Sequence, residues 1–368
     1  MATSDPLTIL MPTFSSENPY HSLLSDALEH RGIQTVSAEL PPIFPLTLEG
    51  VISDEITIVH LDWIYQFYMT TPTTSKTVNT ILTVVRSVTY LLDLLITSVS
   101  STGLVWTIHD IRHGGNNFPR IERLVKEIGL LVSDQVIVKC DLAADMIEAE
   151  YVFADSDDFQ VIRDGNYSEG YPNNISREAA RRELSTDSDR FIYLFFGFIR
   201  EYKGVDILLD VFKNIDQSEV DLWVVGNPDN DNIEKMIRRK SHKKDNINLE
   251  LEYIPVDLVQ NYMNAADVLV LPFREILNSG SVYLGLTFGL PIVTPKMGCI
   301  PTTVSEKNME FMYDGSSEGL RQALESAYES PELDEVAEAN RRRGKELDWE
   351  EPARQLSELY QSVRDREG

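Results

Sequence analysis

A junction between a strand and a helix at residues 268–288 constrains this chain more than any other feature. Residues 268–273 form an apolar run with the length of a buried parallel strand, and residues 283–288 suit a packed helix. Between them, Ser279-Gly280-Ser281 falls at a helix N-terminus, where free backbone N–H groups and the macrodipole favour an anion. The alternative is a serine cap that binds no ligand.

A second junction of the same kind lies at residues 191–212. An apolar strand, 191–196, runs into Gly197, which allows close approach to the backbone. Arg200 and Lys203 then place two cations near the start of a helix predicted at 205–212. A bidentate arginine and a point-charge lysine together suit a diphosphate, and a solvated turn with two surface charges is the alternative.

Four motifs follow one another along the second half of the chain. They are Gly-x-x-Arg-x-x-Lys-Gly (197–204), Ala-Ala-Asp-Val-Leu-Val-Leu-Pro (265–272), Asn-Ser-Gly-Ser (278–281) and Gly-Leu-Pro-Ile-Val (289–293). In this order, over roughly residues 160–362, they resemble the donor half of group-1 (family 4-like) nucleotide-sugar glycosyltransferases of the GT-B fold. The resemblance implies that Arg200 and Lys203 bind the donor diphosphate, that Ser279 to Ser281 cradle its phosphates, and that backbone near Ile254 holds the base.

The chain departs from this family at one pair of residues. Many members carry two glutamates eight positions apart, which bind the sugar and the ribose. The second would fall at Leu284, and Glu275 lies one place from the first. Sugar and ribose binding are therefore expected to differ here, and the donor sugar and the stereochemistry stay open. The candidate donor-binding residues are Gly197, Ile254, Glu275, Asn278, Ser279, Gly280 and Ser281.

The N-terminal half opens with a β-α-β unit of a doubly wound sheet. Residues 7–11 read as a strand, Pro19 opens a helix, and residues 33–37 begin a second strand. Asn18-Pro19-Tyr20 resembles a subgroup of the same family in which this loop faces the acceptor, so Asn18 and Tyr20 are candidate acceptor-binding residues. An ordinary helix start with proline at its first position is the alternative.

The strand predicted at residues 56–63 ends in polar and aromatic side chains. Such residues at the carboxyl end of a parallel strand face the crevice in which open α/β sheets bind ligands. Trp63 offers a flat face for a sugar, and His60 or Asp62 could bond its hydroxyl groups. The alternative places His60 in the core.

Another strand, 104–108, leads into His109-Asp110. The relatives often have Trp-Thr-x-His here, with the histidine near the transferred sugar. His109, with Asp110 beside it, could orient a hydroxyl group or accept its proton; a purely structural histidine is the alternative. His109 and His113 have His-x3-His spacing, but no helix is predicted across them and no third ligand is evident, so no metal site is predicted.

The most apolar region, residues 77–100, has leucines and valines at helical spacing, interrupted by Arg86 and Asp93. The two charges favour one or two amphipathic helices over a membrane span. These helices either pack on the domain's own sheet or rest on a bilayer that presents a lipid-linked acceptor. The net acidity of the chain argues against attraction to anionic lipid headgroups.

The charge balance disfavours one class of partner. Acidic residues number 59 against 33 basic ones, a formal charge of −26, which disfavours nucleic acid. Because the acid is spread along the chain, a halophilic source is predicted.

The two cysteines are too few for a disulfide or zinc framework. The N-terminal residues do not resemble a signal peptide, and no uninterrupted apolar run reaches the roughly 20 residues of a span. A cytoplasmic location is predicted, and the protein could in addition contact the inner face of the membrane peripherally.

These observations predict an α/β protein with two Rossmann-like doubly wound domains that face a central cleft. Residues 1–165 form the acceptor-side domain and 166–348 the nucleotide-sugar domain, and the resemblance implies that a helix at 349–368 packs back on the first domain. The predicted function is transfer of a hexose from a nucleoside diphosphate sugar to a glycan or to a polyprenyl- or dolichyl-linked glycan, with no metal or other cofactor. The alternatives are a sugar-nucleotide epimerase, an inactive nucleotide-sugar-binding subunit and a dinucleotide-dependent oxidoreductase. No Gly-x-Gly-x-x-Gly follows the first strand, which disfavours the last.

Overall fold

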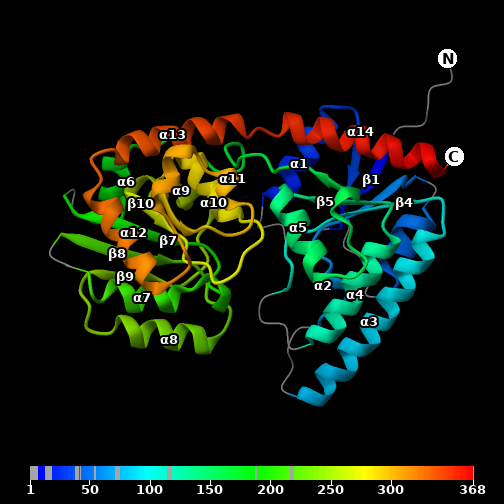
Figure 1. Ribbon diagram of the computed structural model, residues 1–368, viewed down its shortest axis with the longest axis horizontal. Helices are drawn as coiled ribbons and strands as arrows, with labels where there is room; N and C mark the ends of the chain where they lie inside the picture. Colours follow the sequence, from blue (N-terminus) through cyan, green and yellow to red (C-terminus); the bar gives the residue numbers. More distant parts are fainter. Residues whose placement is uncertain are drawn as a thin grey trace. The chain divides into compact units, whose positions relative to one another are not determined.

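The computed structural model describes residues 7–12, 19–37, 41, 43–53, 55–70, 75–113, 118–186, 189–215 and 219–367. The chain divides into two compact units, shown with their elements in Figure 1. Unit 1 comprises Met1–Gly165 together with Trp349–Gly368, and unit 2 comprises Asn166–Asp348.

Unit 1 contains a six-stranded sheet in the order β2-β1-β3-β4-β5-β6, in which every neighbouring pair is parallel. Its strands are β1 (Thr8–Leu10), β2 (Gln34–Val36), β3 (Ile58–Leu61), β4 (Gly103–Thr107), β5 (Gln135–Val138) and β6 (Phe159–Val161). The strand order reverses between β1 and β3. In open α/β sheets, such a reversal opens a crevice at the carboxyl ends of the strands.

The helices of unit 1 connect these strands and cover the sheet. They are α1 (Tyr20–Glu29), the π-helical turn η1 (Thr47–Val51), α2 (Tyr65–Tyr68), α3 (Lys76–Ser98), α4 (Pro119–Val132), α5 (Asp141–Glu150), the 3₁₀ turn η2 (Ser156–Asp158) and α14 (Glu350–Glu367). The last of these, α14, packs on α1 and β4 (Figure 1). A Cβ atom at Gly103 would lie 2.4 Å from Val363 Cγ1, so the glycine that begins β4 lets α14 lie close to the sheet.

Unit 2 has a second parallel sheet, in the order β12-β11-β10-β7-β8-β9. Its strands are β7 (Phe191–Phe196), β8 (Val220–Val225), β9 (Ile247–Glu250), β10 (Val268–Val270), β11 (Ile292–Pro295) and β12 (Met312–Tyr313). Here the order reverses between β7 and β10. These are the two strands that precede the cationic loop and the serine loop predicted from the sequence.

The helices of unit 2 alternate with its strands. They are α6 (Arg177–Glu183), the 3₁₀ turn η3 (Glu201–Lys203), α7 (Val205–Phe212), α8 (Asp231–Ser241), α9 (Val256–Ala265), α10 (Gly280–Phe288), α11 (Ile300–Thr303), the 3₁₀ turn η4 (Glu306–Phe311), α12 (Ser317–Glu329) and α13 (Leu333–Glu346).

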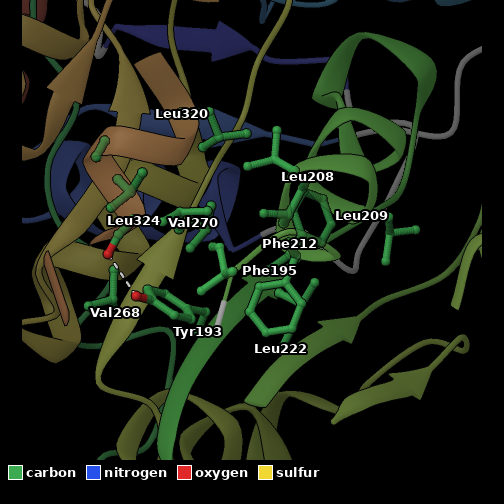
Figure 2. Packing of buried hydrophobic residues seen from close by; sticks show 14 of the residues in the cluster. Tyr193, Phe195, Leu208, Leu209, Phe212, Leu222, Val268, Val270, Leu320 and Leu324 are labelled. Carbon is green, nitrogen blue, oxygen red and sulfur yellow. Dashed lines mark hydrogen bonds between the residues drawn. The ribbon is translucent and has the colours of Figure 1, made fainter. Parts of the chain in front are cut away.

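The core of unit 2 lies between its sheet and the helices α7 and α12 (Figure 2). Tyr193 and Phe195 of β7 point into this core, where Phe212 of α7 packs against them. The Tyr193 hydroxyl donates a hydrogen bond of 2.7 Å to the Leu324 carbonyl of α12, so the polar end of this buried ring is satisfied. The packing fixes β7 and β10 as a pair, and with them the loops that leave their ends.

The predicted α/β class with two doubly wound domains is confirmed. Two boundaries differ from the sequence-based expectation. The strand β10 ends at Val270, before Phe273, and α10 begins at Gly280, three residues before Tyr283. Ser279 is consequently the N-cap residue of α10.

Candidate functional site

The first candidate site lies at the strand-order reversal of unit 2. Because β7 and β10 are parallel neighbours, with Val268 paired to Tyr193 and Leu269 to Leu194, their carboxyl ends meet at one edge of the sheet. The loop 197–204 leaves β7 there, and the loop 271–279 leaves β10. The two predicted anion-binding junctions are therefore adjacent in the fold.

Gly197 is the point on which these two loops converge. Its φ of +123° belongs to the region that favours glycine, and a Cβ atom there would lie 3.3 Å from Lys203 Nζ and 3.4 Å from Ser281 Oγ. An ammonium group from the first junction and a hydroxyl group from the second thus come within contact distance of the same point. Any larger residue at this position would fill the space between them.

Lys203 is held in an unfavourable environment for a charge. Burial lowers the pKa of its ammonium group to about 8, and the nearby positive charge of Arg200 acts in the same direction. A bound anion would offset both effects. Lys203 is therefore suited to bind a negatively charged ligand.

Arg200 lies beside Lys203 with its side chain 29% exposed. Its guanidinium carbon is 5.0 Å from the centre of the Phe198 ring, a cation–π arrangement. Its Nε is 3.7 Å from Asp229 Oδ1, which is beyond hydrogen-bond distance. The ring thus supports the guanidinium group, and the contact with Asp229 is a loose ion pair.

Arg274 joins the two loops, a role that the sequence did not reveal. Its backbone N–H donates to the Tyr202 carbonyl at 2.7 Å, and its guanidinium group donates to the Glu201 carbonyl at 2.5 Å and to Asp206 Oδ2 at 2.7 Å. These three hydrogen bonds link the exit of β10 to η3 and the start of α7. They set the position of Ser279 to Ser281 relative to Lys203.

The serine loop presents the N-terminus of α10. The Ser279 side chain is buried and makes no capping hydrogen bond, and a Cβ atom at Gly280 would lie 3.0 Å from the Tyr167 hydroxyl. The first N–H groups of a helix have no partner within it, so those at the start of α10 are available to an anion.

The remaining donor candidates lie in loops. Ile254 is buried in the loop after β9, Glu275 is exposed, and Asn278 is half-buried. Leu284, where the second glutamate of the relatives would fall, is a buried residue of α10. A carboxylate there would be in the hydrophobic core.

The second candidate site lies at the strand-order reversal of unit 1 and is centred on Asp62. One carboxylate oxygen of Asp62 is 2.7 Å from His109 Nε2, and the other is 2.9 Å from His21 Nε2. The Tyr20 hydroxyl donates to the first oxygen at 3.3 Å. Burial would raise the pKa of Asp62, but hydrogen bonds with His109 and His21 outweigh it and hold this pKa well below its usual range. Asp62 is a permanent carboxylate.

Aromatic rings pack around this cluster. The Trp63 ring stacks on His109 with a centroid separation of 4.4 Å, and Tyr20 packs edge-on against both, with separations of 5.4 and 5.3 Å. Trp349 lies 5.6 Å from Tyr20, also edge-on. A small pocket is lined in part by Asp62, Trp63 and His109. The structure thus brings together Tyr20, Trp63 and His109, three residues predicted separately from the sequence.

Two expectations for this site need correction. His60 is 1% exposed, its Nδ1 is 2.5 Å from the Tyr360 hydroxyl, and its Nε2 is 2.7 Å from Thr107 Oγ1. Burial lowers its pKa to about 4. Because both ring nitrogens are engaged in the interior, His60 is a core residue, as the alternative had it, and does not bind the acceptor. Asp110, in turn, pairs with Lys126 at 2.6 Å, and it is Asp62 that orients His109.

Two further outcomes concern residues near α1. Asn18 lies outside the described residues. His21 was missed because it reads as an ordinary residue in the first turn of α1. Only the adjacency of β1 and β3 brings it to Asp62. In the described part of the chain, no group of three His, Cys, Asp or Glu side chains is arranged to hold a metal ion.

Two doubly wound sheets of this kind define the GT-B class, and comparison with solved structures agrees. Sucrose-phosphate synthase from Thermosynechococcus elongatus superposes with a TM-score of 0.74 at 15% identity, over 97% of this chain and 99% of that one. HepE from Anabaena, solved with UDP and glucose, superposes with a TM-score of 0.72 at 17% identity, over 97% of this chain and 100% of that one.

The family comparison concerns the second unit. Residues 190–330 match the family described as glycosyl transferases group 1, in agreement with the sequence resemblance. A GDP-mannose:glycolipid 4-beta-D-mannosyltransferase of Xanthomonas campestris pv. campestris is 29% identical over 161 residues, which are 42% of this chain. The match spans 44% of the length of that relative, so less than half of it is compared.

Proposed function

We propose that this protein transfers a hexose from a nucleoside diphosphate sugar to a lipid-linked glycan. The observation that carries the proposal is the convergence of Lys203 Nζ and Ser281 Oγ on Gly197, at the strand-order reversal of unit 2. A cation, a hydroxyl group and a helix N-terminus at one point match the needs of a diphosphate.

On the donor side, the reaction breaks the bond between the sugar C1 and the phosphate oxygen, and the electron pair stays on the diphosphate. Lys203, Arg200 and the N–H groups that begin α10 stabilise this developing charge. Fixed donors of this type typically contribute about 10²–10³ in rate. Arg274 keeps the two loops in the arrangement that this requires.

On the acceptor side, a hydroxyl group forms the new bond to C1 and loses its proton. His109 is suited to receive that proton, because its Nε2 faces the permanent carboxylate of Asp62. A proton on Nε2 leaves Nδ1 as the basic nitrogen. Asp62 therefore selects the tautomer that can act as a base, and Trp63 holds the ring from one face. The transfer requires the donor and acceptor sites to meet at the same sugar.

The substrate classes draw support from the relatives. The Xanthomonas protein is named for a GDP-mannose donor and a glycolipid acceptor, and HepE was solved with UDP and glucose. These names favour a nucleoside diphosphate hexose as the donor here. The name of the Xanthomonas protein also favours an acceptor glycan attached to a lipid.

A thermal-shift screen of nucleoside diphosphate sugars tests the donor site. A donor at 100 times its Kd should stabilise the protein by about 2.7 kcal/mol. Arg200→Ala and Lys203→Ala should abolish this shift, whereas Lys235→Ala, which removes a lysine 77% exposed on α8, should retain it. If both loop variants respond like the wild type, the diphosphate assignment is wrong.

Incubation of labelled donor without acceptor tests the alternative of an epimerase, because an epimerase would convert the donor to a new sugar nucleotide.

Asp62→Asn tests the acceptor side separately. An amide cannot fix the His109 tautomer as a carboxylate does, so kcat for transfer should fall by about 10²-fold or more. The donor-induced thermal shift should persist, because no donor-binding residue is altered. An unchanged kcat would exclude His109 and Asp62 from proton transfer.

A further inference from the structure

The helix α3 is inverted relative to a surface helix of an ordinary soluble protein, in which the apolar side faces the core. Its buried residues are mostly polar: Thr83, Ser87, Tyr90, Asp93, Leu94 and Thr97. Its exposed large hydrophobic side chains are all aliphatic: Val78, Ile81, Leu82, Val84, Val85, Val88, Leu92, Leu95 and Ile96. We call these nine residues the outer face of α3.

Polar contacts hold the helix in this orientation. Asp93 accepts hydrogen bonds of 2.8 Å from the backbone N–H groups of Leu46 and Thr47 and one of 2.6 Å from the Thr47 hydroxyl. The half-buried Arg86 donates to the Gln66 and Phe67 carbonyls at 2.7 and 3.2 Å. Rotating the helix to bury its aliphatic side would break all five hydrogen bonds.

The outer face is large for an exposed apolar surface. The helix has 23 residues, which at 1.5 Å per residue gives a length of about 35 Å. Three neighbouring members, Ile81, Val85 and Val88, are 58%, 53% and 52% exposed. A contiguous exposed apolar surface of this extent marks an interaction site.

The exposed charged residues of α3 and α4 are basic, opposite in sign to the net charge of the chain. On α3 this residue is Lys76, and Asp93 is buried. The neighbouring helix α4 packs beside α3 (Figure 1). It exposes Arg120 and Arg123, whereas its two acids face inward. These acids are Glu122, which accepts from the His113 N–H, and Glu127, which accepts from the Val152 and Phe153 N–H groups. In a chain with a net charge of −26, this local arrangement is complementary to anionic headgroups.

The composition of the outer face favours a lipid surface over a protein. Protein interfaces are enriched in aromatic residues, methionine and arginine, and the outer face consists of valine, isoleucine and leucine alone. Aliphatic side chains with no directional groups suit the acyl boundary of a bilayer.

The position of α3 in the sheet favours lying on the bilayer over crossing it. By length and composition this helix could span a membrane, and a third of its most apolar window is buried in the protein. However, it is the crossover between β3 and β4, which pair in parallel with Ile58 opposite Gly103. A spanning helix would have to leave the sheet and expose Asp93 to hydrocarbon.

We propose that the outer face of α3 docks the protein on an anionic lipid bilayer, with the helix axis in the plane of the interface and the basic residues of α4 beside the headgroups. This goes beyond the proposed function and does not depend on it, because binding to vesicles needs neither donor nor acceptor.

Co-sedimentation of the full chain with vesicles tests the proposal. Vesicles of phosphatidylcholine alone are compared with vesicles that also contain phosphatidylglycerol, and the wild type should bind the anionic vesicles more tightly. The variant Ile81→Gln/Val85→Gln/Val88→Gln should lose at least tenfold in partitioning, equivalent to about 1.4 kcal/mol. A control with three exposed apolar residues replaced elsewhere, Val36→Gln/Leu142→Gln/Leu258→Gln, should bind like the wild type. Arg120→Gln/Arg123→Gln should remove the preference for anionic lipid.

Three outcomes would overturn the proposal. The first is a wild type that binds neither vesicle, and the second is an α3 variant that binds as well as the wild type. The third is a lipid-free dimer that the α3 substitutions dissociate, since a second copy would then cover the outer face. The donor-induced thermal shift of the α3 variant should match the wild type, which separates a failure of docking from a failure of the donor site.

Discussion

Two effects disfavour the positive charge of Lys203 in an empty site, and a bound diphosphate would offset both. Its ammonium group is desolvated and lies near Arg200, and these effects lower its pKa to about 8. A diphosphate would supply the missing negative charge and raise this pKa again. Donor binding should therefore be coupled to the uptake of a proton above pH 8.

The pH dependence of donor affinity follows from this coupling. Below pH 8 the lysine is already charged, so the affinity for a nucleoside diphosphate should be nearly constant. As the pH rises through 8 the free protein loses the charge, and the Kd should increase. Lys203→Arg should remove this dependence between pH 7 and 9, because arginine stays protonated. Isothermal titration calorimetry in buffers of different ionisation enthalpy measures both the Kd and the proton uptake. Equal slopes in the two proteins would refute the role of Lys203.

Gly197→Ala should block the donor site by placing a methyl group between Lys203 and Ser281. We expect at least a tenfold loss of donor affinity, together with a destabilisation of about 1–2 kcal/mol from backbone strain at φ +123°. Gly32→Ala is the matched control, because Gly32 also has a positive φ, +77°, and nothing lies within 4 Å of its added Cβ. The control should lose stability but keep donor affinity. If both variants bind donor normally, the convergence at Gly197 has no role in binding.

Among the site residues, those in local sequence motifs were predictable. Those that only the order of strands brings together were not. Gly197, Lys203 and Ser281 stand in recognisable motifs beside strands, so the sequence indicated them. Asp62 and His109 follow different strands, and the sequence indicated only the adjacent Asp110 beside His109. Which carboxylate orients the imidazole depends on the order of strands in the sheet, which no local pattern specifies.

At the scale of elements, His60 ties three of them together. It lies on β3, and it hydrogen-bonds to Thr107 of β4 and Tyr360 of α14. The histidine is neutral in the folded state because burial lowers its pKa to about 4, whereas an unfolded histidine titrates near 6.5. Protonation therefore favours the unfolded state.

Unit 1 should lose stability as the pH falls from 6.5 towards 4. At pH 5, His60 should account for a loss of about 2 kcal/mol relative to pH 7.5. Urea denaturation followed by tryptophan fluorescence reports mainly on this unit, which contains Trp63, Trp106 and Trp349, while unit 2 contains Trp223. Tyr360→Phe should cost about 0.5–1.5 kcal/mol at both pH values, because it removes one hydrogen bond and leaves the histidine in place. A stability that is flat between pH 7.5 and 5 would contradict the buried neutral imidazole.

The existence of most elements was predictable, but the orientation of one was not. Apolar residues at helical spacing correctly indicated helical structure in residues 77–100, where α3 covers Lys76–Ser98 as one helix. Periodicity alone does not say which side of a helix faces inward, and the usual assumption buries the apolar side. In α3 that assumption fails, because Asp93 and Arg86 find backbone partners inside the unit.

For the whole molecule, the net charge of −26 makes stability depend on salt. The acidic residues repel one another over about 10 Å at 0.1 M salt and only about 3 Å at 1 M. The melting temperature should therefore rise between 0.1 and 1 M KCl and then level off. Scanning calorimetry in KCl, with sucrose of equal osmolality as the control for solvent exclusion, separates screening from general preferential exclusion. A melting temperature that falls with KCl would refute the predicted adaptation to high salt.

The division of the chain into two units also affects how it folds during synthesis. Unit 1 consists of two distant stretches of chain, since Trp349 packs against Gly165 and Val363 against Gly103. Unit 2 is continuous and can complete its fold earlier. On the ribosome, at about 5–20 residues per second, the first stretch must wait roughly 10–40 s for the helix that closes it. During this interval the sheet of unit 1 exposes the surface that α14 later covers. A chaperone would therefore protect the chain most at this stage.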